Sequence, residues 1–182
     1  MIGAALALDP DFVALPAAAL ALVLLVGAAQ KLRDFARFRR AVAEYRVLPA
    51  PFALPFAVLI VLTELAAAML LAVPATRPLG ALAALALLLT VSASIAVNLL
   101  RGRSEIDCGC GGPGQTISWG LVARNAVLAL LALAAAVEPT ARAFGLADAA
   151  MIGAGALIWA GLYLAADQLL ANRAAMRRRP AA

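Results

Sequence analysis

The chain has 182 residues, of which 65% are hydrophobic and 14% are charged, and its mean hydropathy is +0.98. Because so few polar residues cannot cover a soluble globule of this size, the composition excludes a soluble domain and predicts an integral membrane protein. The net charge of +5 does not indicate nucleic-acid binding, since the basic residues lie at the ends of apolar runs. The absence of His excludes a His general base, a His metal site and a His haem ligand.

The apolar runs predict an all-α bundle of about five transmembrane helices in a single domain over residues 1–172, followed by a basic tail over 173–182. The helices are expected near 12–29, 52–73, 79–100, 118–137 and 149–170. At ~1.5 Å of rise per residue, runs of this length cross a hydrocarbon core of roughly 30 Å. The segment Met1–Asp11 has no Lys or Arg, so we expect the first run to stay as a helix and not to be removed as a signal peptide.

A short amphipathic helix is predicted between the first two runs. Apolar residues recur there at helical spacing, with arginines mostly on the other side: Leu32, Phe35, Phe38, Val42 and Tyr45. This pattern is typical of a basic helix that lies in the headgroup layer, and Asp34 is a candidate N-cap. A surface that binds a partner is the alternative interpretation.

The basic residues predict the orientation of the bundle. Alternate loops carry twelve Lys and Arg residues on one side and two on the other, with Arg124 inside a helix. The positive-inside rule therefore predicts a multi-pass protein of the inner membrane with its N-terminus outside and its C-terminus in the cytoplasm. The same rule puts the loop that contains both cysteines at the cytoplasmic face.

That loop is the one reactive constellation in the sequence, and it reads Asp107-Cys108-Gly109-Cys110-Gly111-Gly112. Two thiols one residue apart can close a small, strained disulfide, and the glycines supply the backbone freedom that such a ring needs. Strained, exposed disulfides are typical of thiol exchange, whereas a structural disulfide here would close almost no loop. We therefore predict Cys108 and Cys110 as the catalytic residues. Two alternatives remain: buried apolar cysteines, or half of a metal site that a partner completes, since zinc normally takes four ligands.

Polar residues inside the apolar runs form a second candidate site, which consists of Lys31, Glu64, Asn98, Arg124 and Asn125. An ionisable group in hydrocarbon is costly unless it is paired or hydrated, so each is expected to face the bundle interior. Glu64 and Arg124 have opposite charges and are candidates to pair with one another. Either this pair is structural, or it belongs to a polar patch beneath the thiols that binds a headgroup or carries a proton. Lys31 joins that patch or anchors the first helix at the interface.

Several motifs, in order and spacing, resemble the MauE family of methylamine-utilisation accessory proteins, within a broader DoxX-like group of membrane proteins. The motifs are Gln30-Lys31-Leu32-Arg33-Asp34, Glu44-Tyr45-Arg46-Val47-Leu48-Pro49, Glu64-Leu65, Asn98-Leu99-Leu100-Arg101-Gly102-Arg103, the Cys-Gly-Cys-Gly-Gly loop and Trp119-Gly120-Leu121-Val122-Ala123-Arg124-Asn125. The resemblance covers roughly Gly27 to Val137. It differs at Gly111, where the family often has an aromatic residue.

This resemblance implies a small membrane protein that acts with a thioredoxin-like partner in the maturation of a disulfide-rich exported client, the small subunit of methylamine dehydrogenase. The client is periplasmic, whereas the charge rule places the thiols at the cytoplasmic face. One dithiol cannot pass electrons across ~30 Å of hydrocarbon, so a partner, a quinone or membrane-embedded thiols would be needed. No covalently bound cofactor, metal or nucleic acid is expected. We therefore predict a component of a thiol-disulfide oxidoreductase, whose dithiol supports the maturation of an exported protein. A non-redox membrane scaffold and a small proton-coupled transporter stay open as alternatives.

Overall fold

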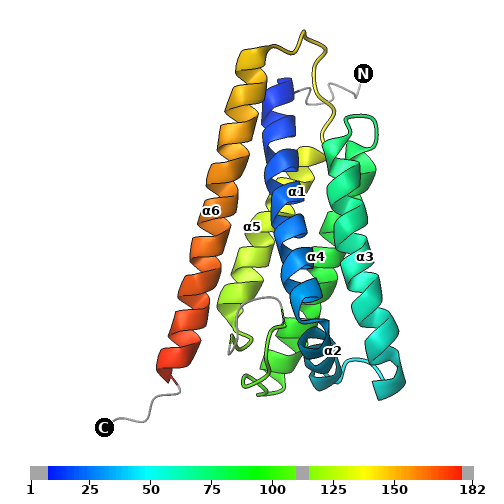
Figure 1. Cartoon of the computed structure of the whole chain (residues 1–182), viewed down its shortest axis with the longest axis vertical. Helices are drawn as coiled ribbons and strands as arrows, with labels where there is room; N and C mark the ends of the chain where they lie inside the picture. Colours follow the sequence, from blue (N-terminus) through cyan, green and yellow to red (C-terminus); the bar gives the residue numbers. More distant parts are fainter. Residues whose placement is uncertain (1–7, 110–114, 178–182) are drawn as a thin grey trace, which may run out of the picture.

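The computed structural model describes residues 8–109 and 115–177 of the chain, and these residues form a bundle of helices (Figure 1). Its elements are α1 Pro10–Arg33, α2 Phe35–Glu44, the 3-10 turn η1 Ala50–Phe52, α3 Ala53–Ala72, α4 Arg77–Leu100, α5 Trp119–Ala135 and α6 Leu146–Arg177. Four of these helices are long and apolar enough to cross a membrane, and α5 is a shorter apolar helix of 17 residues. The predicted all-α membrane fold is thereby confirmed.

Each predicted helix has a counterpart in the structure, with small differences at the ends. The first run continues as helix through its basic end to Arg33, where Asp34 interrupts it. The Asp34 carboxylate then accepts a hydrogen bond from the Arg37 amide at 3.0 Å and caps α2, as the sequence predicts. The last helix continues to Arg177, so part of the predicted tail over 173–182 is helical.

The bundle is built around α1, which packs against α3, α5 and α6, while α3, α4 and α5 pack in chain order. Between lipid-immersed helices there is no hydrophobic driving force for association, so close packing of small residues has to supply it. The buried face of α1 accordingly contains the small residues Ala17, Ala19, Ala21, Gly27 and Ala28. Large apolar residues such as Leu62 and Leu130 are exposed on the outside, where lipid would surround them.

The helices α3 and α4 form a hairpin that is tightest at its turn. A Cβ atom built on Gly80 would lie 2.6 Å from the Leu71 nitrogen, so only glycine allows the two backbones to come this close. Figure 1 shows the two helices side by side at this turn and diverging toward their other ends. The space between the diverging ends is filled by side chains and by the cavity described below.

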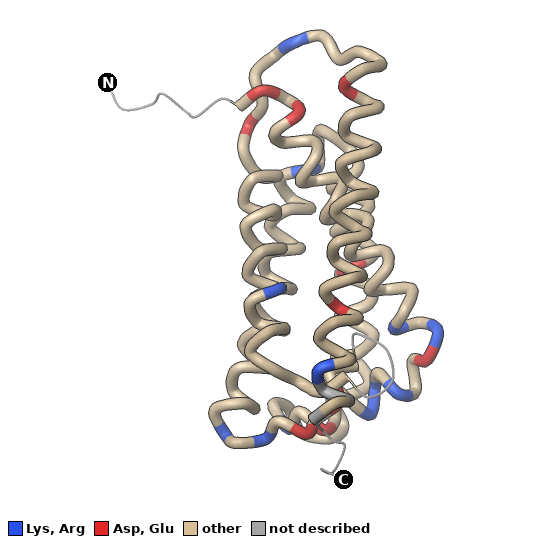
Figure 2. The backbone as a smooth tube through the Cα atoms, turned by 90° about the vertical axis from the view of Figure 1, so that its left-hand side faces the viewer, with Lys and Arg blue, Asp and Glu red and all other residues tan. Residues whose placement is uncertain are grey.

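The two ends of the bundle differ in charge (Figure 2). At the end near the N-terminus, Arg142 from the α5–α6 connection forms ion pairs with Asp9 at 2.9 Å, with Asp11 at 2.7 Å and with Asp148 at 3.0 Å. The opposite end contains α2, the segment between α4 and α5, and the C-terminal end of α6 (Figure 1). Most of the arginines lie at that second end, which we call the basic end.

Candidate functional site

The described residues 101–109 and 115–118, which we call the cysteine segment, lie between α4 and α5 at the basic end. Backbone hydrogen bonds hold them in place. Asp107 forms an isolated antiparallel β-bridge with Thr116. The Cys108 amide donates a hydrogen bond of 2.8 Å to the Gln115 carbonyl oxygen. Cys108 is therefore fixed by the backbone, although glycine follows it directly.

Cys108 is buried, with 3% of its surface exposed, which contradicts the expectation of an exposed thiol. The reason lies in its neighbours Ile106 and Ile117, which are both buried in a small apolar cluster with Leu121. These side chains hold the segment against the bundle, so the neighbouring glycines do not leave the thiol exposed. The second predicted cysteine, Cys110, lies outside the described residues.

An ion pair fastens the cysteine segment to α2. The Arg37 guanidinium donates to both carboxylate oxygens of Asp107, with distances of 2.7, 2.9 and 3.1 Å. Asp107 also accepts a hydrogen bond from the Gly109 amide at 2.9 Å. The negative charge beside Cys108 is thus neutralised by a residue about 70 positions away in the chain.

Gly109 occupies a place that other residues cannot take. Its φ angle is +71°, and a Cβ atom there would lie 2.9 Å from the Ala41 Cβ and 3.1 Å from the Phe38 ring. The glycine after Cys108 therefore allows the segment to lie directly against α2.

Asn98 lies inside the bundle, but it is not among the residues that line the cavity with the other polar groups. It is fully buried near the end of α4, and its side-chain oxygen accepts a hydrogen bond of 2.7 Å from Arg103. Arg103 also donates to the carbonyl oxygens of Glu44 at 2.7 Å and Tyr45 at 3.3 Å. Asn98 thus orients an arginine that ties α4 to the end of α2.

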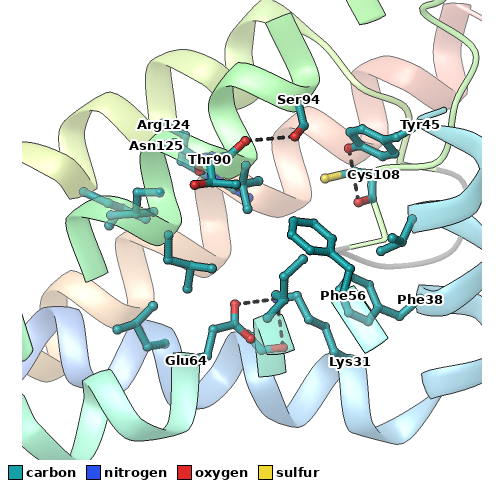
Figure 3. Close-up of a pocket in the computed structure, with 18 of the residues that line it drawn as sticks. Lys31, Phe38, Tyr45, Phe56, Glu64, Thr90, Ser94, Cys108, Arg124 and Asn125 are labelled. Carbon is teal, nitrogen blue, oxygen red and sulfur yellow. Dashed lines mark hydrogen bonds and ion pairs between the residues drawn. The ribbon is translucent and has the colours of Figure 1, made fainter. Parts of the chain in front are cut away.

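A cavity of about 90 Å³ lies inside the bundle next to Cys108 (Figure 3). Four predicted site residues line it together with Cys108: Lys31, Glu64, Arg124 and Asn125. The predicted polar patch beneath the thiol is therefore brought together from α1, α3 and α5 by the fold. At ~10–15 Å³ for each water, the cavity has room for several water molecules.

Lys31 and Glu64 form a buried ion pair on one wall of the cavity, with an Nζ to Oε1 distance of 2.6 Å. Only 4% and 9% of the two side chains are exposed. Gly27 makes room for this pair, because a Cβ atom there would lie 3.3 Å from the Glu64 carboxylate. Lys31 therefore lies in the cavity wall with the other polar residues.

The pairing expected between Glu64 and Arg124 is wrong, because Arg124 forms its ion pair with Asp167 of α6. The guanidinium also lies over the Tyr163 ring, 5.0 Å from its centroid, and donates to the Asn125 side chain at 3.2 Å. Asn125 in turn donates to the Ser92 hydroxyl at 3.2 Å. Two ion pairs therefore line the cavity region where the sequence suggested one.

Gln115 links the Arg124–Asp167 pair to the cysteine segment. Its side-chain amide donates to the Asp167 carboxylate at 3.0 Å and to the Asp167 carbonyl at 3.2 Å. The backbone carbonyl oxygen of Gln115 accepts the hydrogen bond from the Cys108 amide. Gln115 is fully buried, so these bonds fix the cysteine segment against α6.

Sequence reasoning missed Asp167, Tyr163 and Gln115. Asp167 falls within the helix expected over 149–170, but it is not among the residues of the predicted polar patch. A signal was present: Arg124 lies about two turns into its helix from the basic end, and a carboxylate at similar depth in another helix is its natural partner.

Comparison with known proteins gives a consistent result. The family model described as "Methylamine utilisation protein MauE" matches residues 10–138. The chain is similar to the methylamine utilization protein MauE of Paracoccus denitrificans, with 41% identity over 156 residues and 82% of each chain covered. It is 37% identical over 168 residues to the protein of that name from Methylophilus methylotrophus, covering 89% of this chain and 87% of that one. No solved structure matches the chain significantly.

Proposed function

Since this chain belongs to the MauE family of methylamine utilisation proteins, we propose that it is a membrane redox accessory protein whose Cys108 and Cys110 dithiol supports the maturation of an exported protein. The client that the family resemblance suggests is the small subunit of methylamine dehydrogenase. The thiols exchange electrons with a thioredoxin-like partner, which carries the oxidising equivalents to the client.

One observation carries this proposal: Cys108 is a wall residue of a mostly apolar cavity that also contains charged side chains, and it is held there from two sides. The Arg37–Asp107 ion pair fixes it against α2, and Gln115 fixes it against α6. A cysteine that only fills space in an apolar core needs no such supports. A reactive cysteine does need them, because its sulfur has to be held in a defined position for exchange.

The reaction balances as two successive exchanges. A thiolate of the partner attacks the Cys108–Cys110 disulfide, breaks its S–S bond and forms a mixed disulfide. The partner's second thiolate then attacks that mixed disulfide, which leaves the partner oxidised and both loop cysteines as thiols after they take up two protons. The oxidised partner then accepts the two electrons of the client's thiols, which reach it through a carrier in the membrane when the two lie on opposite sides.

We place the basic end of the bundle in the cytoplasm and the N-terminal end outside the inner membrane, because cytoplasmic loops carry an excess of Lys and Arg. Figure 2 supports this orientation, since Lys and Arg gather at the end that contains the cysteine segment. In this orientation the thiols lie on the side opposite an exported client, so the electrons need a carrier through the membrane.

The proposal is tested by thiol trapping in the native host. Cys110→Ser and Cys108→Ser, made separately, should each accumulate a mixed disulfide with a thioredoxin-fold protein, visible as a higher-mass band that disappears on reduction. The double Ser variant should insert normally, yet fail to support client maturation. Full maturation with both cysteines replaced would overturn the proposal and favour a non-redox scaffold.

A small proton-coupled transporter is the second candidate, and the two ion pairs in the cavity region favour it. Ionisable residues within membrane helices commonly mark substrate or proton pathways. Methylamine uptake into proteoliposomes along a proton gradient, abolished by Glu64→Gln, would support transport. Uptake equal to that of empty liposomes would exclude it.

A further inference from the structure

We propose that the cavity next to Cys108 is a binding site for a lipid-soluble quinone, which accepts the two electrons that the dithiol collects. The role as electron acceptor rests on the proposed function, whereas binding itself depends only on the cavity. Three features of the described residues support this site: its access from the side, its polar groups and its apolar walls.

Access to the cavity is from the membrane side of the hairpin formed by α3 and α4. Thr90, near the middle of α4, lines the cavity and is also exposed on the outer surface. Val47 and Leu48, in front of α3, line it too and are 48% and 41% exposed. A residue that is both exposed and part of the cavity wall marks its mouth. Because Thr90 lies at hydrocarbon depth, a molecule entering there must be soluble in lipid.

The polar groups suit a neutral ring with two carbonyl oxygens. Lys31 and Arg124 lie on the cavity wall and carry only hydrogen-bond donors, and carbonyl oxygens accept such bonds. Each cation has a carboxylate at hydrogen-bond distance, Glu64 for Lys31 and Asp167 for Arg124. The two pairs have no net charge, so the site does not call for a charged ligand, and an anionic headgroup fits it less well than a quinone.

The remaining walls are apolar and aromatic. Phe38 and Phe56 lie beside Lys31 and Cys108 in Figure 3, and Leu87, Leu88 and Leu128 contribute aliphatic surface. Ligand sites of this kind combine mostly apolar walls with a few polar groups that set the orientation. Aromatic rings provide flat surfaces on which a planar ring can stack.

The electron transfer is balanced. The two thiols of the reduced dithiol give two electrons and two protons to the quinone, an S–S bond forms between the sulfurs, and the quinone becomes a quinol. The quinol leaves through the side of the bundle into the lipid. The oxidised dithiol is then ready for the next partner.

Binding is tested in the full chain with Cys108→Ser and Cys110→Ser, reconstituted in phosphatidylcholine nanodiscs. The probe is a short-tailed ubiquinone analogue that carries an aryl azide, and labelled residues are mapped by mass spectrometry. We expect labels on cavity-lining residues of α3 and α4, suppressed by excess decylubiquinone and not by excess oleate. Labels that decylubiquinone does not suppress, or that oleate suppresses equally, would overturn the proposal.

A pair of variants on neighbouring residues refines the test. Thr90→Phe should lower the specific labelling by about tenfold, because the added ring overfills the mouth of the cavity. Leu89→Phe adds a similar ring to an exposed residue of α4 that does not line the cavity, and should leave labelling unchanged. An equal effect of both variants would contradict a site in this cavity.

These results separate the two proposals. Quinone binding in a protein whose client matures without cysteines would overturn the proposed function and keep the site. A trapped thioredoxin-like partner in a protein that binds no quinone would overturn the site and keep the proposed function.

Discussion

The Arg37 side chain of α2 donates hydrogen bonds to both carboxylate oxygens of Asp107, the residue directly before Cys108. The helix that the sequence marks as a surface element thus holds the cysteine in place. Its arginine neutralises the carboxylate nearest to Cys108 along the chain, and its Phe38 and Ala41 leave room only for a glycine at 109. The amphipathic helix and the cysteine segment therefore act as one structural unit.

Arg37→Ala should make Cys108 more accessible. A partly exposed ion pair contributes up to about 1 kcal/mol, which corresponds to roughly fivefold faster opening of the segment. The measurement is maleimide labelling of Cys108 in a Cys110→Ser background. Arg40→Ala removes an exposed arginine from the same helix and should not change the labelling rate. Equal rates in all three proteins would mean that the ion pair does not control access.

Gly109→Ala should destabilise the protein more than Gly102→Ala. Both glycines have similar positive φ angles, +71° and +74°, so each substitution introduces backbone strain of about 1–2 kcal/mol. The Cβ atom at 109 would also clash with Ala41, whereas nothing lies within 4 Å of one at 102. Melting temperatures in detergent compare the two variants, and equal losses would show that the contact with α2 is unimportant.

The Lys31–Glu64 pair should show strong coupling in a double-mutant cycle. Lys31→Met or Glu64→Gln alone disrupts a buried pair, which costs on the order of 3–5 kcal/mol, while the double change removes the pair and should cost less than the sum. Unfolding in detergent provides the four free energies. Lys31→Met combined with Glu44→Gln, an exposed glutamate, is the control that should be additive. Additivity in the first cycle would contradict the pairing.

Asp167→Asn should loosen the cysteine segment from a distance. The change weakens the ion pair with Arg124 and disturbs the carboxylate that accepts the Gln115 amide, whose carbonyl receives the Cys108 amide. We therefore expect faster hydrogen exchange at the Cys108 amide. Gln168→Asn alters only an exposed neighbour in α6 and should leave this exchange rate unchanged. Equal exchange rates at the Cys108 amide in the two variants would contradict a coupling between α6 and the cysteine segment.

The cluster of ion pairs around Arg142 should make the stability of the protein depend on pH in the acid range. The hydrogen bond from Arg142 lowers the pKa of Asp9 below its ordinary value of 3.8. A carboxyl whose pKa is lower in the folded state stabilises the fold above the unfolded pKa, and this contribution is lost as pH falls through the folded pKa. Melting temperatures should therefore drop below pH 4, and Arg142→Gln should flatten that drop. An unchanged profile in the variant would show that the cluster contributes nothing.

Hydropathy was enough to predict the fold, because each apolar run is long, nearly uncharged and separated from the next by proline, glycine or charge. The cap at Asp34 was also predictable, since capping depends on residues three positions apart. These features are local, and local physics determines them.

The partners within the site were not predictable in the same way. Opposite charge suggested Glu64 with Arg124, but the choice between Lys31 and Arg124 depends on how α1 and α3 are rotated against each other. The burial of Cys108 likewise depends on where Ile106 and Ile117 pack. Such contacts join residues far apart in the chain, so they depend on how the helices pack and cannot be predicted from a local sequence pattern.

Gly80 gives the α3–α4 hairpin a fixed point of close contact at its turn. Gly80 keeps the two backbones in close contact at the turn, so a change in the angle between α3 and α4 would turn about that point. Thr90 lies ten residues farther along the helix, about 15 Å from this contact at ~1.5 Å per residue. A rotation of α4 by about 5° would therefore move Thr90 by about 1.3 Å. A small tilt near the turn would therefore become a larger displacement of α4 at the depth of Thr90, while the close contact at the turn would be kept.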